Sequence, residues 1–198
     1  MEETLIAETN SVFDDIVVGA GLAGSLLAFG LVQQNRKVLI IDKGQEISSS
    51  SIAAGIINPI TGKNFIKSWN IDIFLPTALT TYREIESFLG IKLIYQKNLI
   101  RSLATPGIEN HWDSRKLDEN YDAYVEKVAD ISQFKDEIKL KSRIAEIKEA
   151  YRIDIGLFIS TFKKYMVENH SFLETELDYT LLDVSENRVV YNNFSANN

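Results

Sequence analysis

A glycine-rich segment and an aspartate beyond it are the residues whose types and spacing could bind a ligand. Gly19, Gly21 and Gly24 form a G-x-G-x-x-G motif, and Asp42 follows. Gly19 permits a tight turn, Gly21 lets a pyrophosphate approach the backbone, and Gly24 lets a helix pack closely on a strand. An acid about 20 residues after the motif accepts hydrogen bonds from an adenosine ribose. The spacing predicts a dinucleotide site; the alternative is a glycine-rich turn that binds nothing.

The elements around the motif must hold these residues in place. The apolar run Ile16-Val17-Val18 predicts a strand that is buried on both faces of a parallel sheet. Leucines on adjacent turns after the motif predict a helix, and residues 38–41 predict a second strand that ends in Asp42. The free N–H groups and the positive dipole at the start of that helix would receive the phosphate charge.

The rest of the chain predicts mixed helices and strands. A helix is expected over about 70–89 with Gly90 as its stop, although Pro76 favours a start near residue 75. A strand or hairpin arm follows at 93–103, and Thr105-Pro106 predicts the start of a short helix. The other expected elements are strands at 121–128, 144–147 and 151–153, a helix at 154–170, and a β-ribbon built from 172–182 and 188–191.

Composition excludes several functional classes. The 198 residues carry a net charge of −7 without a basic cluster, so nucleic-acid binding is not expected. The absence of cysteine excludes disulfides and thiolate chemistry, and two separated histidines argue against a metal site. We find no apolar run long enough for a membrane span and no basic-then-apolar leader, so a soluble, cytoplasmic protein is expected.

The glycine motif, Asp42 and the segment SSSSIAAGIINP together resemble the D-amino-acid oxidase (DAO) family of FAD-dependent oxidoreductases. The resemblance is strong over about 13–69 and faint beyond. It implies that a serine stretch reaches the phosphates of FAD and that a small-residue turn runs along the isoalloxazine ring. The cofactor residues that it implies are Gly19, Ala20, Gly21, Leu22, Ala23, Gly24, Asp42, Lys43, Ser48, Ser49, Ser50, Ala54, Gly55, Ile56 and, through an adenine contact of its backbone, Leu177.

Two departures from the family pattern bear on this assignment. Many members have glutamate and arginine where this chain has Asp42 and Lys43; aspartate keeps the ability to accept from hydroxyls, with a shorter reach. Family enzymes are also much longer, so the resemblance predicts that this chain lacks the C-terminal part that supplies the substrate-binding residues. No catalytic residue is therefore assigned. Arg101 could be proposed as a carboxylate clamp, but ordinary surface arginines at strand ends are far commoner.

The resemblance implies an α/β fold. A Rossmann-like FAD-binding domain would comprise residues 1–72 and 145–198, and residues 73–144 would form an inserted α+β part on the substrate side. The implied reaction is the oxidation of a small-molecule amine or amino acid by hydride transfer to flavin N5. Two alternatives stay open, namely an NAD(H)-dependent oxidoreductase on the same fold and a non-catalytic nucleotide-binding module. The oligomeric state is not predicted.

Overall fold

The computed structural model describes residues 12–44, 49–50, 52–118, 120–126, 143–186 and 188–197. The chain divides into two compact units, the first comprising Met1–Ala53 and Ile155–Asn198 and the second Ala54–Asp154. The assignment of residues 1–72 and 145–198 to FAD binding and of residues 73–144 to the substrate side stays a prediction.

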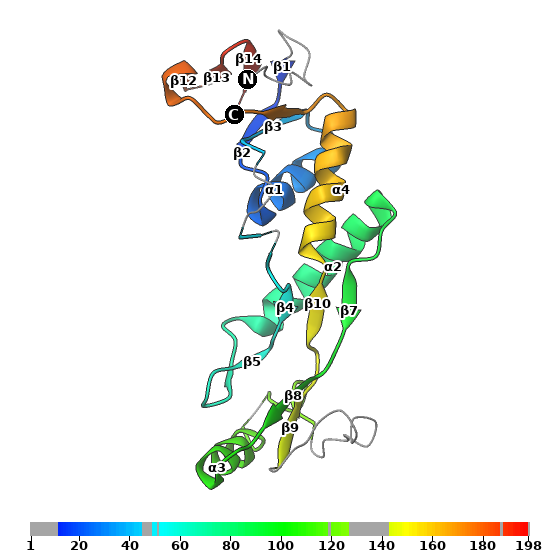
Figure 1. Cartoon of the computed structure of the whole chain (residues 1–198), viewed down its shortest axis with the longest axis vertical. Helices are drawn as coiled ribbons and strands as arrows, with labels where there is room; N and C mark the ends of the chain where they lie inside the picture. The colour runs from blue at the N-terminus through cyan, green and yellow to red at the C-terminus, as the bar shows by residue number, and fades with distance from the viewer. Residues whose placement is uncertain are drawn as a thin grey trace. The chain divides into compact units, whose positions relative to one another are not determined.

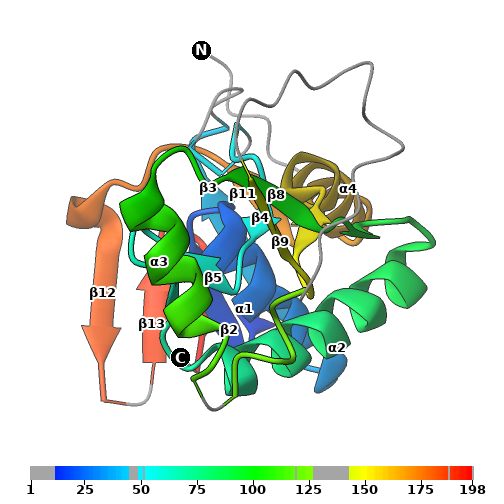
Figure 2. The ribbon, with the colours of Figure 1, turned by 90° about the horizontal axis from the view of Figure 1, so that it is seen from below.

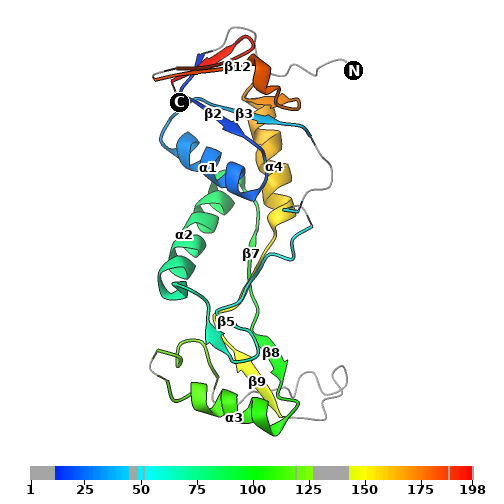
Figure 3. The ribbon, with the colours of Figure 1, turned by 90° about the vertical axis from the view of Figure 1, so that its left-hand side faces the viewer.

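The first unit contains a three-stranded parallel sheet in the order β11–β3–β2, which confirms the predicted α/β fold. Helices α1 and α4 lie side by side along this sheet (Figures 1 and 3). Phe29 of α1 meets Phe162 of α4 edge to face, with 6.2 Å between the ring centroids. The elements are β2 (Asp15–Val18), α1 (Leu22–Gln33), β3 (Val38–Asp42), α4 (Ile155–Glu168) and β11 (Phe172–Glu174).

A second sheet covers the other face of the parallel sheet. Its order is β1–β14–β13–β12, with β1 (Val12–Phe13), β12 (Leu182–Ser185), β13 (Arg188–Tyr191) and β14 (Phe194–Ala196). Leu39 and Ile41 pack with Tyr191 and Phe194 in one buried cluster. Since successive strand residues point to opposite faces, Val38 and Ile40 face the helices, and β3 is buried on both sides.

Two sequence predictions for this unit were wrong. Strand β2 was expected to be buried on both faces, but it is the last strand of the described sheet and Val18 is 55% exposed. Residues 172–182 were expected to form one arm of a ribbon. Instead, β11 pairs in parallel with β3, and the ribbon begins at β12 after the 3₁₀ turn η2 (Tyr179–Leu181). The apolar pattern marked strands but could not choose their partners.

The second unit is an α+β assembly. Figure 2 shows β8 beside β9 and the separate helices α2 and α3. Strand β10 pairs with β4 and β7, and β5 pairs with β6. The bounds are β4 (Ile56–Ile57), β5 (Ile60–Thr61), β6 (Ile66–Lys67), α2 (Ile71–Leu89), β7 (Ile94–Gln96), β8 (Leu99–Ser102), α3 (Pro106–Arg115), β9 (Ile144–Ile147) and β10 (Tyr151–Ile153).

The structure confirms the predicted end of α2 and the predicted start of α3. Gly90 ends α2 in the left-handed conformation, and the Thr105 hydroxyl accepts from Ile108 N at the start of α3. Helix α2 nevertheless begins at Ile71 and continues through Pro76, which lies inside the helix and has no N–H to donate to the preceding turn. The strand expected at 121–128 is absent from its described residues, where Val125 makes a single antiparallel bridge to Ile147.

Across the described ranges, no helix has the length and hydropathy that crossing a bilayer requires. The cytoplasmic location stays a prediction.

Candidate functional site

The glycine motif forms a tight turn between β2 and α1. Gly19 has φ +94°, a conformation that side chains disfavour, and its N–H donates to the Ile41 carbonyl of the next strand at 2.8 Å. A Cβ on Gly24 would overlap the Gly19 carbonyl oxygen. The third glycine is therefore required by the close approach of α1 to the end of β2, as the motif predicted.

Asp42 ties the end of β3 to this turn. Its Oδ2 accepts from Ala20 N at 2.8 Å, and its Oδ1 accepts from Gly44 N at 2.8 Å. Each carboxylate oxygen has a second lone pair left for a ligand. The geometry places the aspartate at the mouth of the glycine turn, where the spacing of the motif required it.

The start of α1 offers backbone donors. Gly21 is the N-cap and provides no side chain to the helix, and Leu22 N donates to Ser50 Oγ at 3.2 Å. The N–H groups of Gly21, Ala23 and Gly24 have no partner among the residues that the structure describes. Together with the helix dipole, these groups can bind an anion, and the Ser50 hydroxyl lies beside them.

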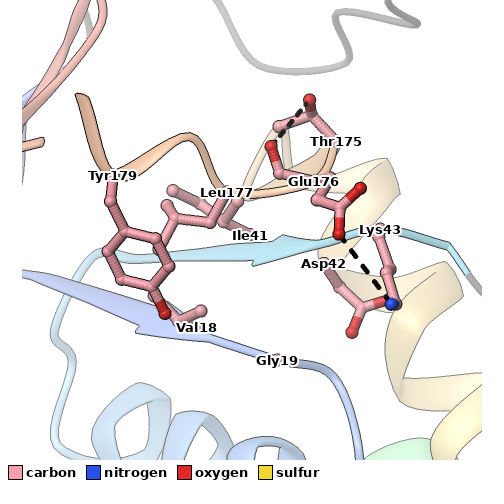
Figure 4. Close-up of a pocket in the computed structure, with 9 residues that line it drawn as sticks. All are labelled: Val18, Gly19, Ile41, Asp42, Lys43, Thr175, Glu176, Leu177 and Tyr179. Carbon is pink, nitrogen blue, oxygen red and sulfur yellow. Dashed lines mark hydrogen bonds and ion pairs between the residues drawn. The ribbon is translucent and has the colours of Figure 1, made fainter. Parts of the chain in front are cut away.

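A cavity opens at the carboxyl end of the parallel sheet. Its volume is about 250 Å³, below the roughly 300 to 1,000 Å³ of pockets that hold a whole drug-sized ligand. Figure 4 shows Leu177 and Tyr179 on one side and Asp42 with Gly19 across from them. The nine lining residues are Val18, Gly19, Ile41, Asp42, Lys43, Thr175, Glu176, Leu177 and Tyr179.

Charge at this cavity is predominantly negative. Lys43 Nζ lies 4.0 Å from Glu176 Oε1; the Lys43 side chain is half-exposed and that of Glu176 is exposed. Asp42 adds a second carboxylate beside this pair (Figure 4). Carboxylates can accept hydrogen bonds from neutral hydroxyl groups, whereas they repel a phosphate.

The structure brings together many of the predicted residues. The turn itself comprises Gly19 to Gly24, and Asp42 and Ser50 are hydrogen-bonded to it. The cavity is lined by Asp42 together with Lys43 and Leu177. Ser49 forms no hydrogen bond with the described residues, and Ser48 lies outside them.

The predicted flavin-ring turn lies in the second unit. Gly55 has φ +66°, and its carbonyl accepts from Ile153 N at 2.8 Å. Ile56 pairs with Arg152 across β4 and β10, and Ala54 precedes this pair. The local geometry therefore demands a glycine at this point, and contact of these residues with a cofactor stays a prediction.

Sequence reasoning missed Thr175, Glu176 and Tyr179 as cavity residues. They follow β11, which was expected to belong to a ribbon. The helix that precedes β11 gave no usable signal, because the strand before that helix, β10, pairs with β4 and β7 in the second unit, whereas β11 pairs in parallel with β3.

Arg101 has a structural role in the second unit. Its Nη1 donates to the Gly62 carbonyl at 2.9 Å, and its guanidinium lies 4.5 Å from the centroid of the buried Phe65 ring. Phe65 has φ +52°, so the guanidinium covers a ring held in an uncommon backbone conformation. The geometry favours the structural role over the carboxylate clamp.

Comparison with known protein families identifies one match that covers most of the chain. The family described as "FAD dependent oxidoreductase" (DAO) matches residues 14–161. A curated relative, Protein FixC of Escherichia coli (strain K12), is 38% identical over 47 residues, which are 24% of this chain and 11% of FixC. The sequence match to FixC thus covers a short segment only.

Solved structures share the fold over the greater part of the chain. L-amino acid deaminase from Proteus myxofaciens has a TM-score of 0.67 and 15% identity, covering 100% of this chain and 46% of the deaminase. Glycine oxidase from Geobacillus kaustophilus has a TM-score of 0.60 and 18% identity, covering 81% of this chain and 45% of the oxidase. This chain therefore spans less than half the length of either protein.

Proposed function

Because the chain belongs to the DAO family of FAD-dependent oxidoreductases, we propose that its glycine turn and cavity bind FAD for the oxidation of a small-molecule amine or amino acid. The observation that carries the proposal is the pair of hydrogen bonds that the Asp42 carboxylate accepts from Ala20 N and Gly44 N, which hold this acid at the glycine turn. The family match supports FAD as the cofactor.

The residues of the first unit fit the adenosine diphosphate half of FAD. The N–H groups of Gly21, Ala23 and Gly24 would donate to the pyrophosphate, and Ser50 would lie beside it. Asp42 would accept from the ribose hydroxyls. A side chain at Gly21 would approach the Ser50 hydroxyl to 3.3 Å, so glycine keeps this space open for a phosphate.

When bound, FAD would supply the electron acceptor for hydride transfer from the carbon that bears the amine to flavin N5. The chain's own contribution is to bind and orient. For the second unit we propose that the turn Ala54-Gly55-Ile56 lies along the ring and excludes water there. The names of the structural neighbours, an amino acid deaminase and a glycine oxidase, support an amine or amino-acid substrate.

Flavin binding is tested first. We expect the purified chain to carry, or to gain on reconstitution with FAD, the visible absorbance of an oxidised flavin, and to show a higher Tm with FAD. Anaerobic addition of amino acids and simple amines should bleach this absorbance, whereas the matching 2-hydroxy acids should not. A chain that neither gains absorbance nor is stabilised by FAD contradicts the proposal.

Two other outcomes correspond to the alternatives. Since the chain spans less than half of the deaminase and of the glycine oxidase, FAD binding without bleaching by any amine would favour a non-catalytic nucleotide-binding module. Stabilisation by NADH but not by FAD would favour the NAD(H)-dependent reading. The negative charge around Asp42 disfavours NADPH in either case.

A further inference from the structure

Tyr179 is an exposed aromatic residue whose ring borders the cavity. It is 75% exposed, and its hydroxyl has no partner among the described residues. Figure 4 places the ring beside Leu177 and Val18, on the side of the cavity away from Asp42. A large aromatic side chain that remains exposed beside apolar neighbours is suited to covering a flat ligand.

The backbone that carries Tyr179 is held in place from several directions. The Asp178 carboxylate accepts from Thr180 N at 2.9 Å and from Thr180 Oγ1 at 2.7 Å. Asp178 N donates to the hydroxyl of Tyr191 at 3.2 Å, and Tyr191 is buried in the core between the two sheets. The ring is thus exposed on an anchored turn, which lowers the entropy cost of binding through it.

The backbone of Leu177 adds polar groups next to this ring. Its N–H and C=O have no hydrogen-bond partner among the described residues. The residues on either side are held by the Tyr191 hydroxyl, which accepts from Asp178 N and donates to the Glu176 carbonyl. An adjacent donor and acceptor match the edge of adenine, which carries an amino donor and ring-nitrogen acceptors. A planar base could therefore use the ring of Tyr179 and the backbone of Leu177 together.

We infer that Tyr179 stacks on the adenine base of the bound dinucleotide and so selects ligands that carry an aromatic base over base-free phosphates. The inference rests on the proposed binding of FAD at this cavity. Asp42, Leu177 and Tyr179 would then contact the ribose, the edge of the base and the face of the base, respectively.

The test measures binding of FAD, ADP and inorganic pyrophosphate to the full chain by calorimetry. Stacking losses on alanine substitution correspond to about a fivefold to hundredfold change in affinity, so Tyr179→Ala should weaken ADP and FAD by that factor and leave pyrophosphate unchanged. Tyr179→Phe should bind ADP within about twofold of the wild type, because the ring is retained. Leu181→Ala is the matched control, since Leu181 lies on the same turn and is 49% exposed but does not line the cavity.

Tyr179→Trp adds a spectroscopic readout. Its indole fluorescence should change on addition of ADP and not on addition of pyrophosphate. Wild-type ADP affinity in Tyr179→Ala, or an equal loss of ADP and pyrophosphate binding, would overturn the inference while the FAD proposal stands. If the wild type binds neither FAD nor ADP, the proposed function fails as well.

Discussion

Asp42 Oδ2 lies 2.8 Å from Ala20 N, so the acid at the end of β3 accepts a hydrogen bond from the glycine turn itself. The two residues are 22 positions apart in the chain. The contact gives the aspartate a structural task in addition to its proposed contact with ribose, because it orients the turn that presents the backbone donors. Stability and cofactor affinity should therefore respond together to changes at this position.

Replacement of Asp42 by asparagine tests this coupling. The carboxylate accepts hydrogen bonds from two N–H groups. An amide keeps one acceptor oxygen but turns an NH₂ group, which cannot accept, toward one of those two donors. We expect the free energy of unfolding to fall by about 1 to 3 kcal/mol, the range for hydrogen bonds to charged groups, and FAD affinity to fall at least about tenfold. Urea denaturation and calorimetry measure the two effects. Asp183→Asn, an exposed change on β12, should alter neither.

Two glycines of α1 form a matched pair for testing close packing. Alanine at Gly24 would overlap the Gly19 carbonyl, whereas alanine at Gly30 meets nothing within 4 Å. We expect Gly24→Ala to lower the free energy of unfolding by about 1 to 3 kcal/mol through overpacking. Gly30→Ala should raise it by about 0.5 to 1 kcal/mol, because alanine is the better helix former. Equal effects in urea denaturation would show that the turn is not tightly packed.

The Glu86 carboxylate is expected to make a pH-dependent contribution to the stability of the folded chain. Burial opposes its ionisation, but hydrogen bonds from Ile94 N and Leu93 N, with Lys92 nearby, outweigh burial and lower the pKa of Glu86 below its ordinary value. The distances from its Oε1 are 2.8 Å to Ile94 N and 2.6 Å to Leu93 N. A lowered pKa in the folded state stabilises the protein above the unfolded pKa, about 4.3, and this stabilisation is lost as the pH falls through the folded value.

We therefore expect Glu86→Gln to cost about 1 to 3 kcal/mol of stability at neutral pH and progressively less below about pH 4. Urea denaturation across this pH range measures the difference from the wild type. Glu84→Gln, on the exposed side of the same helix, should cost little at any pH. A difference for Glu86→Gln that does not shrink at low pH would contradict the assignment.

Arg101→Gln separates a structural arginine from a ligand clamp. Loss of the hydrogen bond to Gly62 O and of the contact with the Phe65 ring should lower the free energy of unfolding by about 1 kcal/mol. FAD affinity should be unchanged when measured by calorimetry. Arg83→Gln serves as the control, because Arg83 is exposed on α2 and forms no ion pair or hydrogen bond with described residues. Lost FAD affinity with unchanged stability would favour a ligand role instead.

Local signals in the sequence were enough to locate the glycine turn between β2 and α1. Position 19 has a positive φ angle that favours glycine, and position 24 has no space for a Cβ atom. Both requirements can be recognised from the residue type alone. Gly90 marked a helix end because it adopts the left-handed conformation, and Thr105 marked a helix start because its side chain accepts a hydrogen bond from the first turn. Such constraints act between near neighbours in the chain, and a single sequence records them.

Only the tertiary structure decided what faces Asp42 across the cavity. Thr175, Glu176 and Tyr179 reach it because β11 pairs in parallel with β3, although more than 120 residues separate the strands. The same apolar alternation would have suited a ribbon, since strand pattern specifies which face is buried but not which strand lies alongside. Pairing depends on how the whole unit packs, and so does the place of Tyr179 beside the cavity.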